Sequence, residues 1–189
     1  MDLFEYITVL TSIIVGLGMA HLLRGLAQLA QHPGRYKVYW VHLLWVGFMF
    51  LNLIFFWWWE FALVEIEVWK FRDYAFVILY AVILYLLCAM LFPSDLDDYD
   101  GYADYFLSRR IWFFGLFAVS NAVDVYDTML KGMDHFSELG VAYIVFTTAF
   151  MILAITGAIT RRHSVHAGLV IVAIIYQTWW ALQFWSEQA

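Results

Sequence analysis

Long apolar runs alternate with short polar segments along the whole chain. A helix needs about 20 residues to cross about 30 Å of hydrocarbon, and each run reaches roughly that length. Strands of a membrane barrel would instead alternate apolar and polar residues. The pattern predicts an all-α membrane protein, a six-transmembrane-helix bundle that forms one domain over residues 1–189. The predicted helices comprise residues 4–30, 38–64, 74–92, 111–130, 139–159 and 167–185.

Helix-breaking residues stand between these runs. His32-Pro33-Gly34 follows the first run, Pro93-Ser94 follows the third, and Lys131-Gly132 follows the fourth. Proline cannot continue a helix, and glycine favours its end. Tryptophan and tyrosine also gather near the run ends, where their amphipathic rings prefer the headgroup layer. Both signals support the predicted helix boundaries.

Composition excludes an ordinary soluble domain. The chain is 65% hydrophobic and 14% charged, with a mean hydropathy of +0.76, whereas soluble domains are about half apolar and about a quarter charged. Membrane-spanning helices satisfy their own backbone donors and acceptors, so such a chain is suited to lipid. The net charge of −6 gives no support to nucleic-acid binding. We therefore expect the lipid bilayer as a partner and no nucleic acid.

The basic residues indicate the orientation, because short cytoplasmic loops retain Lys and Arg while acidic residues count little. Alternate loops hold most of them, namely Arg35, Lys37, Arg109, Arg110, Arg161 and Arg162, and the other loops hold Lys70, Arg72 and Lys131. Both the N-terminus and the C-terminus are therefore expected outside. The chain opens with Asp2 and Glu5 and lacks a small-residue cleavage pattern, so the first run is expected to be a retained helix rather than a signal peptide.

Several segments in the first third of the chain carry a family resemblance. They are Phe4-Glu5-Tyr6, the stretch 12–18, His21-Leu22-Leu23, Tyr39-Trp40-Val41-His42 and Trp57-Trp58-Trp59. These segments resemble those of a family of small bacterial multi-pass inner-membrane proteins of uncharacterised function. The resemblance implies a location in the bacterial inner (plasma) membrane, and it implies no activity that could be carried onto these residues.

Ionisable residues occur inside the apolar runs, where they are costly. The cost is about 2.5 to 3.5 kcal/mol near a helix centre, so such groups usually face the bundle interior or water. In the fourth run, Ser120 and Thr128 share a face with the acidic and amide residues between them. His42 and Glu60 also share a face, because they are eighteen residues, or five turns, apart. We expect a polar interior that comprises His21, Arg24, His42, Asn52, Glu60, Asn121, Asp124 and Asp127.

Two functions fit such an interior. The first is permeation or transport of a proton or small cation, with Asp124 and Asp127 as an outer cation-attracting site. The pairs His21/Arg24 and Asp124/Asp127 have the same spacing, which suggests 3+3 inverted halves as in many transporters. The alternative is a non-catalytic membrane scaffold or accessory subunit, whose polar residues hold the helices together.

An enzyme is the less favoured interpretation. The acidic segment 95–101 resembles a calcium loop, but Leu96 and Leu107 would occupy ligand positions. The same segment has only part of the aspartate motif of a metal-dependent lipid phosphotransferase, since the alanine-arginine pair that should follow is absent. The alternative interpretation of this segment is a solvated acidic loop.

Histidines on the expected cytoplasmic side provide a third hypothesis. Neutral imidazole is the commonest metal ligand, so His21 and His42 are candidates for b-type haem or metal binding, with His163 and His166 as weaker metal candidates. No other cofactor is expected.

Small residues recur every four positions in the first run, at Thr8, Ser12, Gly16 and Ala20. Such a ladder lets another helix approach closely. The partner is either another helix of the same chain or a second copy, so a homo-oligomer or another membrane protein is expected as a partner.

Overall fold

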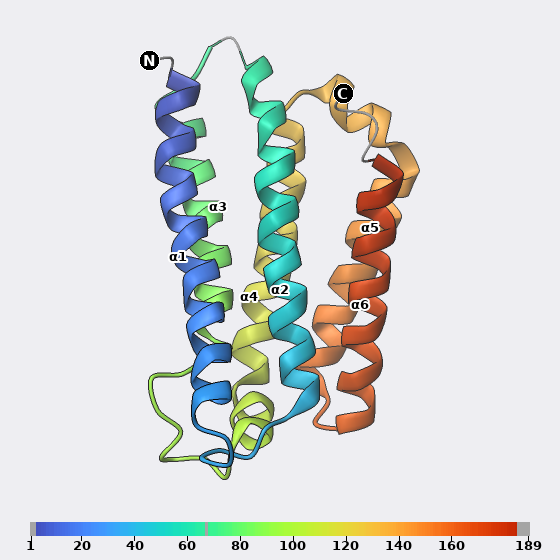
Figure 1. Ribbon diagram of the computed structural model, residues 1–189. Coiled ribbons are helices and arrows are strands. Elements are labelled where there is room, and N and C mark those ends of the chain that lie inside the picture. The colour runs from blue at the N-terminus through green and yellow to red at the C-terminus, as the bar shows by residue number, and fades with distance from the viewer. Residues whose placement is uncertain (1–2, 67, 185–189) are drawn as a thin grey trace.

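The computed structural model describes residues 3–66 and 68–184, which form an elongated helical bundle (Figure 1). All regular structure within these residues is helical, so the all-α prediction is confirmed. The elements are α1 (Leu3–Gln31), α2 (Trp40–Trp59), the 3-10 helix η1 (Glu60–Glu65), α3 (Phe71–Ala89), α4 (Tyr102–Leu130), α5 (Met133–Ile159) and α6 (His163–Phe184).

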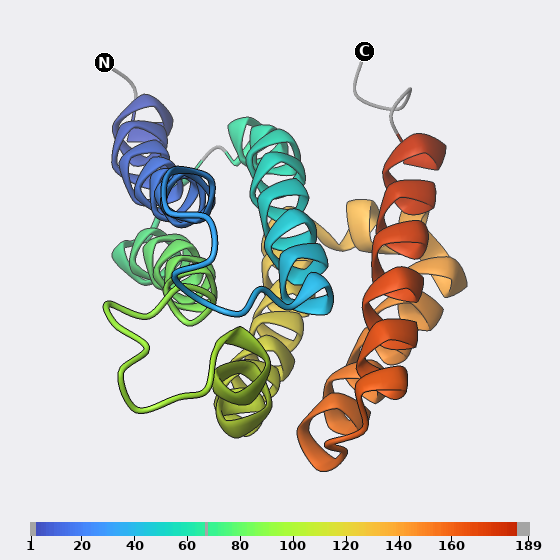
Figure 2. The same ribbon diagram turned by 60° about the horizontal axis from the view of Figure 1, so that its bottom comes forward.

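The long helices run alternately up and down and form three pairs. α1 packs chiefly on α3, α4 on α5, and α2 on α6. Viewed toward one end, α2 and α4 lie between α1 and α3 on one side and α5 and α6 on the other (Figure 2). The first helix of each half therefore packs differently, since α1 lies on the third helix of its half and α4 on the second. This packing does not support the predicted 3+3 inverted halves.

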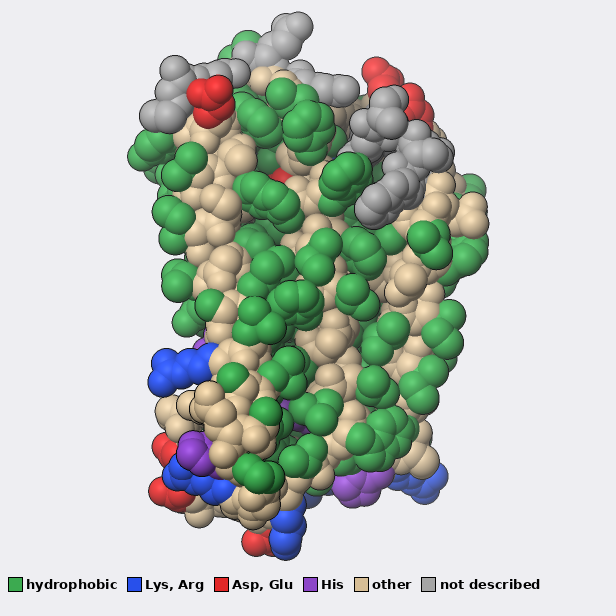
Figure 3. Space-filling model, in the orientation of Figure 1, with side chains coloured by type: hydrophobic (Ala, Val, Ile, Leu, Met, Phe, Trp, Pro, Cys, Tyr) green, Lys and Arg blue, Asp and Glu red, His purple; other side chains and the backbone are tan. Residues whose placement is uncertain are grey.

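The two ends of the bundle differ in their connections. α1 begins and α6 ends at the same end, together with η1 and the α4–α5 turn, and we call this the terminal end (Figure 1). The other end, which we call the basic end, carries the connections 32–39, 90–101 and 160–162. Lys, Arg and His side chains gather there on the face seen in Figure 3, while hydrophobic side chains cover the middle of the bundle.

Five helices are long and apolar enough to cross a membrane, which fits a multi-pass membrane protein. α4 is the exception among the long helices, although it has 29 residues. Its sequence is less apolar because one face carries Ser120, Asn121, Asp124, Asp127 and Thr128. The spans with suitable composition are Phe4–Gln31, Trp40–Val64, Phe71–Ala89, Phe136–Ile159 and His163–Gln183.

Two helix starts differ from the prediction by more than four residues. α4 begins at Tyr102 rather than at residue 111, because Gly101 (φ 134°) ends the preceding loop and the Tyr102 N–H donates to the carbonyl of Lys37 at 3.1 Å. α5 begins at Met133 rather than at residue 139, and it bends sharply at Gly140 (φ 57°, ψ −150°). The predicted end of the last helix, residue 185, lies outside the described residues.

An aromatic layer fills the middle of the bundle. Trp45 lies at its centre, with ring centroids 5.3 Å from Phe48, 5.5 Å from Phe113 and 5.2 Å from Phe114. Edge-to-face pairs at such distances are favourable beyond the area that they bury. The layer consists of Trp45, Phe48, Phe113, Phe114, Phe117 and Phe150, all buried.

The second half of the small-residue ladder of α1, Gly16 and Ala20, does not pack against the rest of the described chain. A Cβ on Gly16 would meet nothing within 4 Å, and Ala20 is exposed. The close approach between α1 and the end of α3 occurs instead at Gly25, where a Cβ would lie 2.2 Å from the ring of Phe92. Within the described residues, Gly16 and Ala20 face away from the bundle, whereas Thr8 lines the smaller of two cavities.

Candidate functional site

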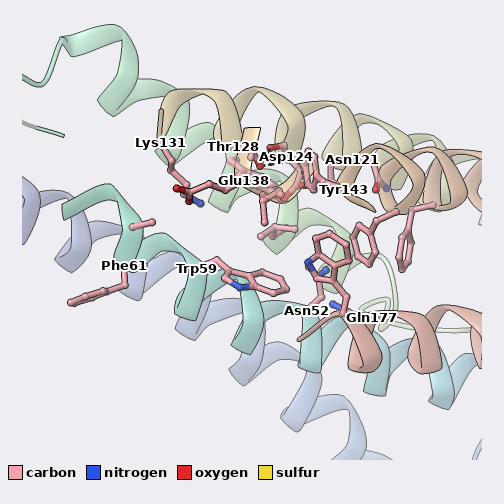
Figure 4. Close-up of a pocket in the computed structure, with 18 of the residues that line it drawn as sticks. Asn52, Trp59, Phe61, Asn121, Asp124, Thr128, Lys131, Glu138, Tyr143 and Gln177 are labelled. Atoms are coloured by element: carbon pink, nitrogen blue, oxygen red, sulfur yellow. Dashed lines mark hydrogen bonds between the residues drawn. The ribbon is translucent and has the colours of Figure 1, made fainter. Parts of the chain in front are cut away.

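A cavity of about 530 Å³ lies between α2, α3, α4, α5 and α6 near the terminal end. Figure 4 shows its two walls, one formed by α4 and α5, and the other by α2 and α6. Asp134 and Glu138, which line the cavity at the start of α5, are exposed, so the cavity reaches the surface at the terminal end. Its polar lining includes Asn52, Ser120, Asn121, Asp124, Thr128, Lys131, Tyr143 and Gln177.

The aromatic layer closes the other end of this cavity. Phe48, Phe117 and Phe150 are the lining residues of α2, α4 and α5 that lie nearest to the basic end. Their ring centroids lie 5.6 to 6.0 Å from one another. Trp45 packs directly beneath them, against Phe48 and Phe117. The cavity therefore opens at one end only among the described residues.

Asp124 is held by hydroxyl groups from two neighbouring helices. Tyr80 of α3 donates to Oδ1 at 2.9 Å, and Tyr143 of α5 donates to Oδ2 at 2.7 Å. The Thr128 hydroxyl lies 2.9 Å from the Tyr143 oxygen. We call these four residues the Asp124 network. Because hydrogen bonds to a carboxylate are stronger than neutral ones, they orient Asp124 along the cavity wall.

A buried ion cluster adjoins this network. The Lys131 ammonium lies 2.8 Å from Glu60 Oε1 and 2.5 Å from Asp127 Oδ2. The three side chains are only 7%, 8% and 2% exposed, respectively. Glu60 Oε2 and Asp127 Oδ1 are buried without a hydrogen-bond partner. With Asp124, the site contains three carboxylates and one ammonium group.

A smaller cavity of about 190 Å³ lies on the other side of Glu60, toward α1 and α3. Thr11, whose buried hydroxyl also has no partner, lines it together with apolar residues. Lys131 lines the large cavity and Glu60 lines the small one. The Lys131–Glu60 ion pair therefore links the walls of the two cavities.

His21 and His42 lie at the basic end and bind the main chain after α3. His21 Nε2 is 2.9 Å from the Phe92 carbonyl, and His42 Nε2 is 2.6 Å from the Leu91 carbonyl. Because a carbonyl oxygen only accepts, each Nε2 carries the hydrogen. His42 also stacks on Tyr102 at 4.7 Å. Both histidines thus satisfy carbonyl groups that the end of a helix leaves open.

The other predicted histidine candidates also have hydrogen-bond partners. His163 Nδ1 lies 3.2 Å from the Tyr39 hydroxyl, and His166 Nε2 lies 3.0 Å from the Thr160 carbonyl. Over residues 3–66 and 68–184, no three His, Cys, Asp or Glu side chains are grouped as a metal site would require. Haem or metal binding stays a prediction.

The predicted polar interior divides into two parts. The structure brings Asn52, Asn121 and Asp124 to the large cavity, with Glu60 and Asp127 in the adjoining ion cluster. His21 and His42 lie beyond the aromatic layer, at the basic end. The expected interior position of Arg24 is wrong, because its side chain is exposed near that end of α1. A long arginine side chain at such a position can extend along the helix surface toward the headgroup region.

Several site residues were not predicted. Lys131 was predicted only as a loop residue, although it lies four residues after Asp127, which is the i,i+4 spacing of an ion pair on a helix. Tyr80 and Tyr143 carry no such signal, because each is one hydroxyl in an apolar run and its partner, Asp124, lies on another helix. Gln177 carries none either, because one amide in an apolar run does not show which cavity it lines.

Comparison with known protein families, with curated proteins and with solved structures found no match to this chain. The resemblance to bacterial inner-membrane proteins therefore stays a prediction.

Proposed function

We propose that the protein takes up a proton or small cation into the large cavity and transports it across the membrane. The observation that carries this proposal is the charge balance of the site, three carboxylates against one ammonium group, beside a cavity open at one end. An uncompensated negative charge away from water is costly, so the site favours a further positive charge.

The cavity faces the outside in this proposal. The basic end carries Arg35, Arg109 and Arg161, which fits a cytoplasmic location, and the terminal end would then face outward with both chain termini. α4 is the sixth span, with its polar face turned toward the cavity and the other helices instead of lipid. The family resemblance implies that this membrane is the bacterial inner membrane, and we include that location in the proposal.

Transport by this bundle requires a conformational change. The rings of the aromatic layer separate the cavity from the basic end, so an ion that has entered cannot continue along the same route. We propose that α2 moves relative to the α4–α5 pair to open this layer. Small shifts of packed helices are a common way to open such a site.

A scaffold or accessory subunit is the second candidate. The exposed small-residue ladder of α1 favours it, because Gly16 and Ala20 are available to a second copy or to another membrane protein. In that case the polar residues of the cavity would only fix the packing of the helices.

Flux measurements in proteoliposomes distinguish the two candidates. Purified protein is reconstituted with a dye inside that is sensitive to pH, to Na⁺ or to K⁺, and uptake of the corresponding ion is measured under an imposed membrane potential. We expect flux above empty liposomes for the wild type and at least tenfold less for Asp124→Asn. Asp97→Asn makes the same chemical change in an exposed loop at the basic end and should leave the flux unchanged. Wild-type flux equal to that of empty liposomes would contradict transport and favour the scaffold.

A further inference from the structure

The large cavity has more room than an inorganic ion needs. We infer that its ligand is an organic ammonium ion with an apolar body, and this inference rests on the proposed function. A water molecule takes about 30 Å³ of liquid, and cavities that bind small organic molecules measure about 300 to 1,000 Å³. At about 530 Å³, the cavity falls in the second range.

The cavity walls provide aromatic faces as well as a carboxylate. Tyr143, Phe146 and Trp180 form one aromatic group, with ring centroids 6.2 Å apart for Tyr143–Trp180 and 4.6 Å apart for Phe146–Trp180. Trp59, at the end of α2, also lines the cavity (Figure 4). Aromatic faces attract cations and also exclude water from an apolar body. This combination suits a ligand that is charged at one end and apolar at the other.

The cavity also contains an unused hydrogen-bond acceptor. Gln177 is 3% exposed and lines the cavity, and its Oε1 has no hydrogen-bond donor. Figure 4 places Gln177 next to Asn52, on the wall that faces Asp124 and Asn121. A buried acceptor without a donor costs about 1 to 3 kcal/mol. A ligand N–H group would satisfy it.

Asp124 has the capacity to bind the ammonium group. Each of its oxygens accepts one hydrogen bond, from Tyr80 and from Tyr143. An ionised carboxylate has about four acceptor positions. The remaining positions can accept ammonium hydrogens, so the Asp124 network would hold the charged end while the aromatic walls hold the apolar end.

Two sources could supply this chemistry, a free amine from the aqueous phase or the ethanolamine headgroup of a lipid. Titration calorimetry in nanodiscs of phosphatidylglycerol alone tests the free amine. The buffer is phosphate, because amine buffers would compete. Benzylammonium is the probe, and benzyl alcohol is its neutral analogue of similar size.

We expect saturable binding of benzylammonium and at least tenfold weaker binding of benzyl alcohol to the wild type. This comparison needs no variant, so it stays informative if a variant does not fold. Asp124→Asn should weaken benzylammonium binding at least tenfold and Gln177→Leu about threefold to tenfold, the range for losing one hydrogen bond. Asp97→Asn should leave it within twofold.

Nanodiscs that contain phosphatidylethanolamine distinguish the two sources. If the headgroup occupies the cavity, the apparent affinity for benzylammonium falls as the ethanolamine lipid fraction rises. If the affinity does not change, the source is a free amine. Either outcome supports an ammonium ligand.

Equal binding of the two probes would overturn the inference. So would the absence of benzylammonium binding in a protein that still shows Asp124-dependent proton, Na⁺ or K⁺ flux, and the proposed function would then stand without it. Absence of both binding and flux would contradict both.

Discussion

The buried polar groups at the two ends of the bundle differ in their hydrogen bonding and in their position relative to the cavities. At the basic end, His21 and His42 donate to successive carbonyls after α3. The buried nitrogens there that lack a partner, on His42, Arg110 and His166, line neither of the two cavities. At the terminal end, Glu60, Asp127 and Gln177 each keep a buried oxygen without a partner, and two of these residues are carboxylic acids beside the Lys131 ammonium. Satisfied groups stabilise a fold, whereas unsatisfied ones beside a cavity are typical of a binding site. The comparison separates the residues that we propose to be functional from those that stabilise the fold more clearly than residue type does.

Removal of Lys131 should have the largest effect on stability. Lys131→Met leaves Glu60 and Asp127 buried without their cation, which typically costs about 3 to 5 kcal/mol. Thermal unfolding in detergent, followed by circular dichroism, measures the change. The triple variant Glu60→Gln, Lys131→Met, Asp127→Asn should recover most of the loss, because it removes all the charges together. A single variant as stable as the wild type would show that the ion cluster is hydrated.

Loss of the His42 hydrogen bond should destabilise the basic end without affecting cation uptake. His42→Phe keeps a ring against Tyr102 but leaves the Leu91 carbonyl without its donor, at a cost of about 1 to 3 kcal/mol. The exposed His32 gives the matched control, His32→Phe, which should change little. Stability and liposome flux are measured on the same preparations. If a stably folded His42→Phe variant lost its flux, this result would contradict the proposal that the two ends have different roles.

The packing of α1 against the end of α3 should also be sensitive. In Gly25→Ala, the new methyl group would overlap the Phe92 ring, which typically costs about 1 to 3 kcal/mol in a filled core. Gly16→Ala is the control, since nothing lies within 4 Å of its Cβ position. Unfolding temperatures of the two variants, compared in the same detergent, should differ clearly. Equal values would mean that Phe92 moves aside without cost.

The smallest effect is expected at the edge of the Asp124 network. Thr128→Val removes the hydroxyl that lies 2.9 Å from the Tyr143 oxygen, a neutral hydrogen bond worth about 0.5 to 1.5 kcal/mol. Chemical denaturation would measure this small difference. Tyr143 would still donate to Asp124, so cation uptake should persist. Complete loss of uptake would indicate that the Thr128 hydroxyl itself contacts the ion.

Sequence alone predicted the helices well, because a run of about twenty apolar residues has few other stable forms. It placed the start of α4 too late, since Arg109 and Arg110 indicated a loop although they lie within the helix. Asp124 stood out as a charge in an apolar run. Gln177 did not, because one amide on an apolar helix shows neither its burial nor its cavity.

The two histidines show why roles are harder to predict than positions. Their acceptors lie 71 and 49 residues away in the sequence, and each is a main-chain carbonyl. Every residue has such a carbonyl, so no residue type in the sequence marks the partner. The same pattern was therefore consistent with a haem site, a polar pathway or a structural role.

The bend in α5 has a mechanical consequence. Gly140 has a φ of 57°, a backbone conformation that residues with a Cβ rarely adopt. The first turns of α5, up to this residue, lie along the rim of the cavity. Asp134 and Glu138 lie on this short segment before the bend, apart from the rest of their helix. The backbone conformation of Gly140 therefore sets the width of the cavity entrance. This width can change by evolution or by motion, while the chemistry of the cavity stays the same.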